Sequence, residues 1–184
     1  MYCAERPVYG ILCSMKEKEE LKRRVLDLAN RCYQQNIYTF SGFLNVAEVS
    51  DVYAMERELD FVPWKLFGGT EGCERQMLRF GSEETLGYEE AFPISCVVIR
   101  PSASKFAEEL THRDFLGALM NLGIERDVLG DIIVRGAVGY VFCEDAMADY
   151  LEKNITQVRH TTMTTEVTKE CPAQAAPQFA EEEF

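Results

Sequence analysis

The order of apolar segments between residues 95 and 167 limits the fold more than any other feature of the sequence. Cys96-Val97-Val98-Ile99 predicts a buried strand, and apolar residues at helical spacing follow from His112. Two further strand-like runs, a second helical pattern and a threonine-rich strand come next. The predicted elements are a strand at 95–100, a helix at 112–121, a helical turn at 125–129, strands at 131–135 and 137–143, a helix from Glu144 or Asp145 to about Ile155, and a strand at 158–167.

These elements predict a β-α-β-β-α-β module. Gly136 leaves only a short connection between the two middle strands, so they must pair as an antiparallel hairpin, whereas each helix makes a crossover. Right-handed crossovers then produce the split β-α-β arrangement of ferredoxin-like folds. We therefore expect an α+β protein with a ferredoxin-like, RRM-like domain.

The segment before this module is predicted to hold two helices and a short hairpin. Apolar residues at three- and four-residue steps indicate a helix at 15–35, and Asn45 is a suitable N-cap for a helix reaching about Leu59. The aromatic stretch 37–44 is expected to connect these helices, and the second helix is expected to bury Val46, Val49 and Tyr53. Strand-like runs at 64–67 and 76–80 flank a glycine cluster, which is typical of a turn. We expect an N-terminal helical region at 1–60, a ferredoxin-like domain with an N-terminal hairpin extension at 61–167, and a disordered linker at 168–184.

Composition favours the reducing cytosol and excludes several classes of protein. The seven cysteines are scattered singly, without a Cys-x-x-Cys pair, and the two histidines complete no metal-ligand spacing. No apolar run approaches the roughly 18–20 residues needed to cross a bilayer, and the N-terminus lacks the features of a signal peptide. We expect a cytoplasmic protein that binds no metal, no cofactor and no membrane.

Net charge argues against general nucleic-acid binding. The chain carries −12, and residues 101–167 hold 6 basic against 11 acidic side chains, a balance of −5. Most of the affinity for nucleic acid comes from neutralising phosphates, which an acidic surface does poorly. Any RNA contact must therefore depend on a few well-placed basic residues.

Two short motifs match known loops only in part. His112-Arg113-Asp114 has the letters of a protein-kinase catalytic loop, but Leu119 stands where that loop requires asparagine. Gly69-Thr70-Glu71-Gly72 matches the G-x-x-G loop of KH domains, yet a glutamate lies inside it and strands flank it. A plain turn is the better interpretation, with the neighbouring Arg75 kept as a candidate phosphate contact.

Three side chains of the second hairpin strand leave two alternatives open. Val138, Tyr140 and Phe142 project from one face because side chains alternate along a strand. In RNA-recognition modules of this topology, aromatic residues on the corresponding strand stack on bases. The alternative is that these side chains face the helices as core, since the opposite face offers only Ala137, Gly139 and Val141.

The densest basic run does not by itself indicate an RNA site. Lys16, Lys18, Lys22, Arg23 and Arg24 alternate with glutamates, which favours a solvated helix face. Catalysis is not indicated either, because a cysteine nucleophile would need a nearby base and only two histidines are present. We expect no enzymatic activity.

A longer pattern resembles a known family. The run His112-Arg113-Asp114-Phe115-Leu116-Gly117-Ala118-Leu119, then Leu122-Gly123-Ile124-Glu125-Arg126 and Leu129-Gly130-Asp131-Ile132, is similar to the signature of the YlmH family of bacterial S4-domain RNA-binding proteins. Gly68-Gly69 with Cys73-Glu74-Arg75 resembles an upstream element of that family, although Thr70 departs from its usual aromatic residue. The resemblance extends from about Phe43 to Pro177.

The resemblance implies both an architecture and a site. It implies an RRM-like middle domain followed by an S4 domain, which is not within these 184 residues. His112 and Arg113, at a helix N-terminus, are the first candidates for phosphate contact, followed by Arg126. His112 could equally be an N-cap or a buried histidine. Structural roles are expected for Asp131 and for three glycines, which would serve close packing, a helix stop and a turn: Gly117, Gly123 and Gly130.

Three functions follow as hypotheses. The first is a non-catalytic RNA-binding module that acts at the ribosome, with ribosomal RNA or tRNA and the large subunit as partners; its nucleic-acid-binding candidates are His112, Arg113, Arg126, Arg75, Tyr140 and Phe142. The second is a protein-interaction module that docks on a ribosomal or cell-division protein while an S4 domain binds RNA. The third, a hydrolase or transferase, would require a pocket with a perturbed cysteine or carboxylate.

Overall fold

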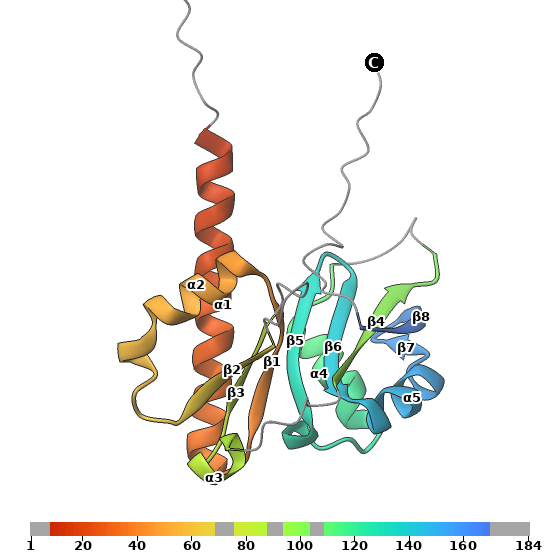
Figure 1. Ribbon diagram of the computed structural model, residues 1–184. Helices are drawn as coiled ribbons and strands as arrows, with labels where there is room; N and C mark the ends of the chain where they lie inside the picture. Colours follow the sequence, from red (N-terminus) through yellow and green to blue (C-terminus); the bar gives the residue numbers. More distant parts are fainter. Residues whose placement is uncertain (1–7, 69–75, 88–93, 104–108, 170–184) are drawn as a thin grey trace, which may run out of the picture.

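The computed structural model describes residues 8–68, 76–87, 94–103 and 109–169, and these form two antiparallel sheets that lie side by side (Figure 1). One sheet, of order β1-β3-β2, belongs to the first half of the chain, and the other, of order β5-β6-β4-β8-β7, to the second half. Helices cover one face of each sheet, and β1 and β5 meet where the sheets adjoin (Figure 1).

The first half combines helices with a three-stranded sheet. Its elements are α1 (Val8–Gln35), β1 (Thr39–Leu44), α2 (Val46–Ala54), the 3-10 turn η1 (Glu56–Glu58), β2 (Trp64–Gly68), β3 (Gln76–Phe80) and α3 (Glu83–Leu86). The aromatic stretch expected to connect the two N-terminal helices is thus a strand, which pairs with β3 of the predicted hairpin. The helical region expected at 1–60 therefore contributes a strand to the same sheet as that hairpin.

Apolar faces of α1 and α2 pack on this sheet. Their contacts form a core that includes Leu28, Val52 and Leu59, all at most 4% exposed. Asn45 caps α2 as expected, since its side chain accepts from the Glu48 amide at 2.9 Å. Two residues expected in this core, Val46 and Tyr53, are instead 60% and 58% exposed, because the buried face of the short helix runs through Val52.

The second half has the predicted ferredoxin-like topology. Its elements are β4 (Ile94–Pro101), α4 (His112–Asn121), the 3-10 turn η3 (Arg126–Val128), β5 (Leu129–Arg135), β6 (Val138–Glu144), α5 (Asp145–Asn154), β7 (Gln157–Val158) and β8 (Thr161–Thr168). The hairpin β5–β6 pairs with β4, and β8 lies on the other side of β4. This order requires the two helical crossovers inferred from the sequence, so the prediction of an α+β ferredoxin-like fold is confirmed.

Helices α4 and α5 cover one face of this five-stranded sheet. Phe115, Leu119 and Leu151 are fully buried there, against strand residues such as Val97 and Val141. Gly139 leaves room for the ring of Phe115, since a Cβ at this glycine would lie 2.5 Å from it. Two large apolar side chains of these helices point outward: Met120 is 54% exposed and Tyr150 is 44% exposed.

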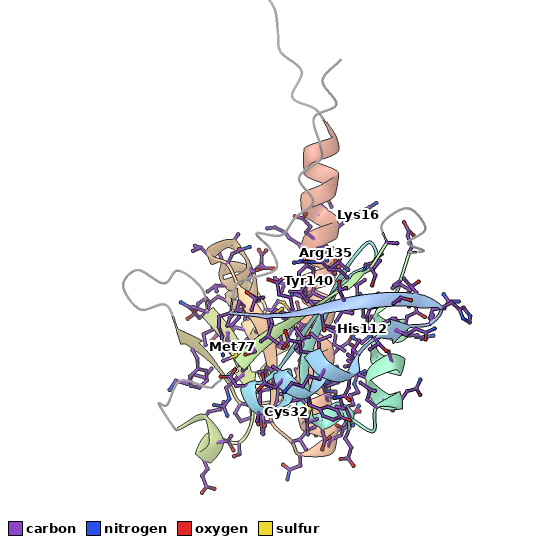
Figure 2. The ribbon with its side chains drawn as sticks, turned by 90° about the vertical axis from the view of Figure 1, so that its right-hand side faces the viewer. Lys16, Cys32, Met77, His112, Arg135 and Tyr140 are labelled. Atoms are coloured by element: carbon purple, nitrogen blue, oxygen red, sulfur yellow. The ribbon has the colours of Figure 1, made fainter. Side chains whose placement is uncertain are left out.

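The opposite face of the five-stranded sheet packs against the first half of the chain. Phe142 and Tyr140 of β6 join Phe40 of β1 and Met77 of β3 in one buried cluster, and Met77 and Tyr140 lie inside the molecule (Figure 2). The approach is close, because a Cβ at Gly130 would lie 2.2 Å from the Phe40 ring. The molecule therefore buries both faces of its second sheet.

Candidate nucleic-acid interface

A cleft of about 670 Å³ separates α1 from the segment that carries α4, η3 and β5. We call it the α1–α4 cleft. Three of the sequence-predicted residues, His112, Arg113 and Arg126, line it together. The α1 side adds three arginines that the sequence interpretation did not select, Arg23, Arg24 and Arg31, and acidic side chains are contributed by Glu20, Asp27, Glu109 and Asp131.

The arginines of α1 reach the cleft because of their spacing. Residues 20, 23, 24, 27 and 31 recur at helical intervals of three, four, seven and eight, so they share one face of α1. The lysines lie elsewhere: Lys18 pairs with Asp51 and Lys22 with Glu58, each at 3.0 Å, beside the first half of the chain. The basic run that was interpreted as one solvated face is therefore divided, with Lys18 and Lys22 on one side and the arginines on the other.

A buried ion pair joins the two walls of the cleft. Nε of Arg24 lies 3.2 Å from Oδ2 of Asp131, and the two side chains are only 9% and 6% exposed. Neither atom forms an aligned hydrogen bond with another described residue, so the attraction is mainly coulombic. Asp131 has the structural role expected for it, but its partner comes from α1.

Arg31 supplies a second buried cation beside this pair. Its Nη2 donates to the carbonyl oxygen of Leu129 at 2.8 Å, while its Nε has no hydrogen-bond partner among the described residues. Burial lowers the pKa of Arg31 to about 10, and the nearby positive charge of Arg126 adds to this effect. Arg31 remains a cation at neutral pH, so the cleft holds a desolvated positive charge with an unused donor.

His112 lies in the same positive electrostatic field, close to the arginines of the cleft. Burial lowers its pKa below the usual 6.5, and Arg126 and Arg23 lower it further, whereas Asp131 and Asp27 act in the opposite direction. The depressed pKa makes His112 neutral at physiological pH while the cleft is empty of anions. A phosphate placed in the cleft would oppose the influence of the arginines and favour the imidazolium form.

Pairing within the cleft leaves an excess of cations. Asp131 is engaged by Arg24, and Glu20 is engaged at 2.8 Å by Arg135, which lies at the end of β5. Four arginines then face two acidic side chains, Asp27 and Glu109. Of these four, Arg23, Arg113 and Arg126 form no ion pair with any residue of the described ranges. The cleft is thus locally positive on an acidic chain.

The N-terminus of α4 opens at this cleft. Thr111, rather than His112, is the N-cap, and its amide and hydroxyl both donate to Oδ2 of Asp114, at 2.8 and 2.7 Å. The alternative of His112 as N-cap is therefore wrong: it is the first residue of the helix and half-buried in the cleft wall. The exposed Arg113 follows it, so both side chains lie beside the positive end of the helix dipole.

The remaining predicted residues do not join the cleft. Tyr140 is 5% exposed and Phe142 is fully buried, because strand β1 covers the face on which they project. Base stacking by these two side chains, as expected from RNA-recognition modules, is contradicted by this burial. The alternative that they belong to the core is confirmed by this burial. They face β1 and β3 rather than the helices, since the helix-facing residues of β6 are Val141 and Cys143. Arg75 lies outside the described residues.

Other kinds of site are not indicated by the described residues. Within them, no three His, Cys, Asp or Glu side chains are grouped closely enough to hold a metal ion. Burial raises the pKa of the Cys143 thiol to about 12, which leaves it unreactive at neutral pH. The length and hydropathy that a membrane-crossing helix requires are not found together in any helix among these residues.

The fold and the cleft define a ferredoxin-like α+β module with an arginine-lined cleft beside its first helix. Residues 88–170 match the family described as "Putative RNA-binding domain in YlmH". This match confirms, for residues 88–170, the resemblance to YlmH drawn from the sequence. The chain is also similar to a solved structure, "Cell division protein ylmH from Streptococcus pneumoniae", with 16% identity and a TM-score of 0.39 over 91% of this chain and 96% of that one. No curated protein matches the chain.

Proposed function

We propose that the chain binds RNA through the α1–α4 cleft, without catalysis. The observation that carries this proposal is the convergence of Arg23, Arg113 and Arg126, none of them in an ion pair within the described residues, around the N-terminus of α4. Guanidinium groups bind phosphate through paired donors, and the helix terminus adds favourable electrostatics. The family of residues 88–170 supports RNA as the source of the phosphates.

The partner we propose is ribosomal RNA or tRNA at the large ribosomal subunit, in the cytoplasm. This assignment follows from the resemblance to YlmH, whereas the cleft itself accounts for phosphate binding. Because the covered face of the second sheet leaves Tyr140 and Phe142 inaccessible, we expect RNA recognition that does not depend on base stacking by these two side chains.

Anisotropy titration of a labelled ribosomal RNA hairpin, repeated at several salt concentrations, tests the proposal. Replacing Arg113 and Arg126 together by Ala should weaken binding by about tenfold for each arginine, as expected for charge-assisted hydrogen bonds. It should also reduce the slope of log K against log salt by about 0.7–0.9 per lost contact. Lys22→Ala is the matched control, since it removes one positive charge from the other side of α1.

Equal affinities for the arginine variant and the control would overturn the cleft as the RNA site.

One observation favours a second function. Residues 101–167 carry a net charge of −5, so their acidic surface is suited to a basic protein partner. Ribosomes captured by the full chain and then treated with nuclease separate the two functions. Release by nuclease supports RNA binding, whereas retention supports a protein-interaction module.

A further inference from the structure

A second hollow lies on the other side of α4. It measures about 450 Å³ and is bounded by α4, the end of α5 and the turn at β7. We call it the α4–β7 groove. Arg113 lines both this groove and the α1–α4 cleft, so the two hollows adjoin at the start of α4. The arrangement of α4, α5 and β7 in one corner of the second half can be followed in Figure 1.

The lining of the groove is polar and carries few charges. Arg159 lies beside Asp114 near the start of α4. Asn121, Asn154 and Gln157 supply amide groups, of which Asn154 donates to the Tyr150 carbonyl and Gln157 to the Arg159 carbonyl. The acidic member, Asp114, already accepts two hydrogen bonds from Thr111, and these bonds lower its pKa. Amide side chains can both donate to and accept from base edges, which lysine and arginine cannot do.

Arg159 occupies an unusual backbone position for its type. It is the first residue of the two-residue connection between β7 and β8, and its φ is +53°. Glycine or asparagine is favoured at such a position, because the left-handed region is strained for a long side chain. Its Nε lies 3.6 Å from Oδ1 of Asp114, too far for a hydrogen bond, and the side chain is half exposed. Intramolecular contacts therefore do little to explain an arginine here.

Gly117 lies on the α4 wall of the groove with open space in front of it. A Cβ built at this glycine meets no atom within 4 Å, in contrast to Gly139 and Gly130, whose positions are filled by rings. The close-packing role expected for Gly117 is thus wrong. A glycine in mid-helix weakens the helix, so the presence of a glycine at this unpacked position is consistent with a surface that another molecule approaches closely.

We infer that the two hollows form one continuous binding track for single-stranded RNA, which crosses the start of α4 at Arg113. Phosphates occupy the α1–α4 cleft, and the following nucleotides lie in the α4–β7 groove, where the amides contact base edges and Arg159 contacts a further phosphate. Single-stranded RNA fits this lining because unpaired bases offer their Watson–Crick and Hoogsteen edges to side chains, whereas in a duplex those edges are paired or lie in a deep, narrow groove. This inference rests on the proposed function and deepens it.

The length dependence of binding tests the track. Wild-type chain should bind an unstructured RNA of about 12 nucleotides more tightly than one of about 4, since the longer strand can occupy both hollows. Arg159→Asn should reduce the advantage of the long RNA about tenfold and leave the short RNA unaffected. Asparagine suits the positive φ of this residue, so unfolding should not explain the loss.

A carboxylate placed at two positions of α4 provides a matched pair of variants. Gly117→Glu should weaken only the long RNA, because it places the carboxylate in the groove, whereas Met120→Glu, on the exposed side of α4 outside both hollows, should leave both affinities unchanged. Unchanged affinity of Arg159→Asn and Gly117→Glu for the long RNA, while Arg113→Ala weakens both, would overturn the track but leave the proposed function standing. Equal binding of a duplex of the same length would overturn the single-stranded assignment. Absence of RNA binding by the wild type would refute the proposed function itself.

Discussion

Replacing the carboxylate of Asp131 by an amide, in Asp131→Asn, tests how α1 is held against β5. The change keeps the shape of the side chain but leaves Arg24, 9% exposed, without its counter-ion, and it removes the anion that offsets the charge of the buried Arg31. At 3.2 Å and an effective dielectric constant of about 20, the gross attraction of the pair is about 5 kcal/mol. Removal of one partner from a buried pair costs about 3–5 kcal/mol, and we expect the free energy of unfolding to fall by that amount.

The double variant Arg24→Met, Asp131→Asn should recover most of this loss. It removes both charges, so neither remains buried without compensation, and methionine retains the apolar stem that lines α1. We expect its stability to lie within about 1.5 kcal/mol of the wild type. The interaction energy between the two sites, taken from the full cycle of variants, should therefore exceed about 2 kcal/mol.

Urea unfolding followed by circular dichroism gives the four free energies required. The measurement should be repeated at about 1 M salt, where the Debye length is only about 3 Å, because a buried pair is poorly screened and the interaction energy should persist. Additive losses, with an interaction energy below about 0.5 kcal/mol, would show that the pair does not fasten α1 to β5. An interaction that disappeared in high salt would instead show that these side chains are solvated.

Three further outcomes follow from the structure. Gly130→Ala should lower stability by about 1–3 kcal/mol, measured by urea unfolding, because its Cβ would lie 2.2 Å from the Phe40 ring; no loss would mean that the ring shifts freely. The pKa of His112 is lowered from 6.5 in the folded chain, so the unfolded chain holds more protons near that pH. The free energy of unfolding should therefore fall as the pH drops from 6.5 through the lowered pKa, while RNA affinity rises. His112→Gln should remove the first trend from urea unfolding and the second from anisotropy titrations. Alkylation at neutral pH, mapped by mass spectrometry, should leave the buried thiols of Cys32, Cys96 and Cys143 unmodified until urea unfolds the chain. Rapid modification of these thiols in the native protein would contradict their burial.

Local signals account for the parts of the fold that the sequence predicted well. The predicted bounds of α4 match the structure because both ends are encoded nearby: Thr111 and Asp114 bond to each other at the start, and Gly123, with a φ of +77°, follows the end. The single turn at Gly136 likewise determines how β5 and β6 pair. These features depend on neighbours within a few residues, so no knowledge of the rest of the chain was needed.

Contacts between distant segments account for what the sequence did not show. One wall of the α1–α4 cleft comes from α1, whose Arg24 meets a partner more than a hundred positions along the chain. A signal was present, since the arginines of α1 share one helical face while the paired lysines lie elsewhere, but its meaning depends on which element lies opposite. Along β6, apolar side chains alternate on both faces, as in Tyr140 and Val141. That pattern indicates two buried faces but not that β1 covers one of them.

The meeting of β1 and β5 has a consequence for how the protein can be divided and kept in solution. Each is the terminal strand of its own sheet, and an open terminal strand offers unpaired backbone groups to other chains. Placed side by side, each strand hides the other from such strand addition, and the aromatic side chains of β1 close over Phe142 at the same time. A fragment cut to residues 88–170 would lose this cover, so an apolar sheet face and an open edge would be presented together. We expect that fragment to self-associate, because residues 8–87 no longer cover its apolar face and its open strand edge.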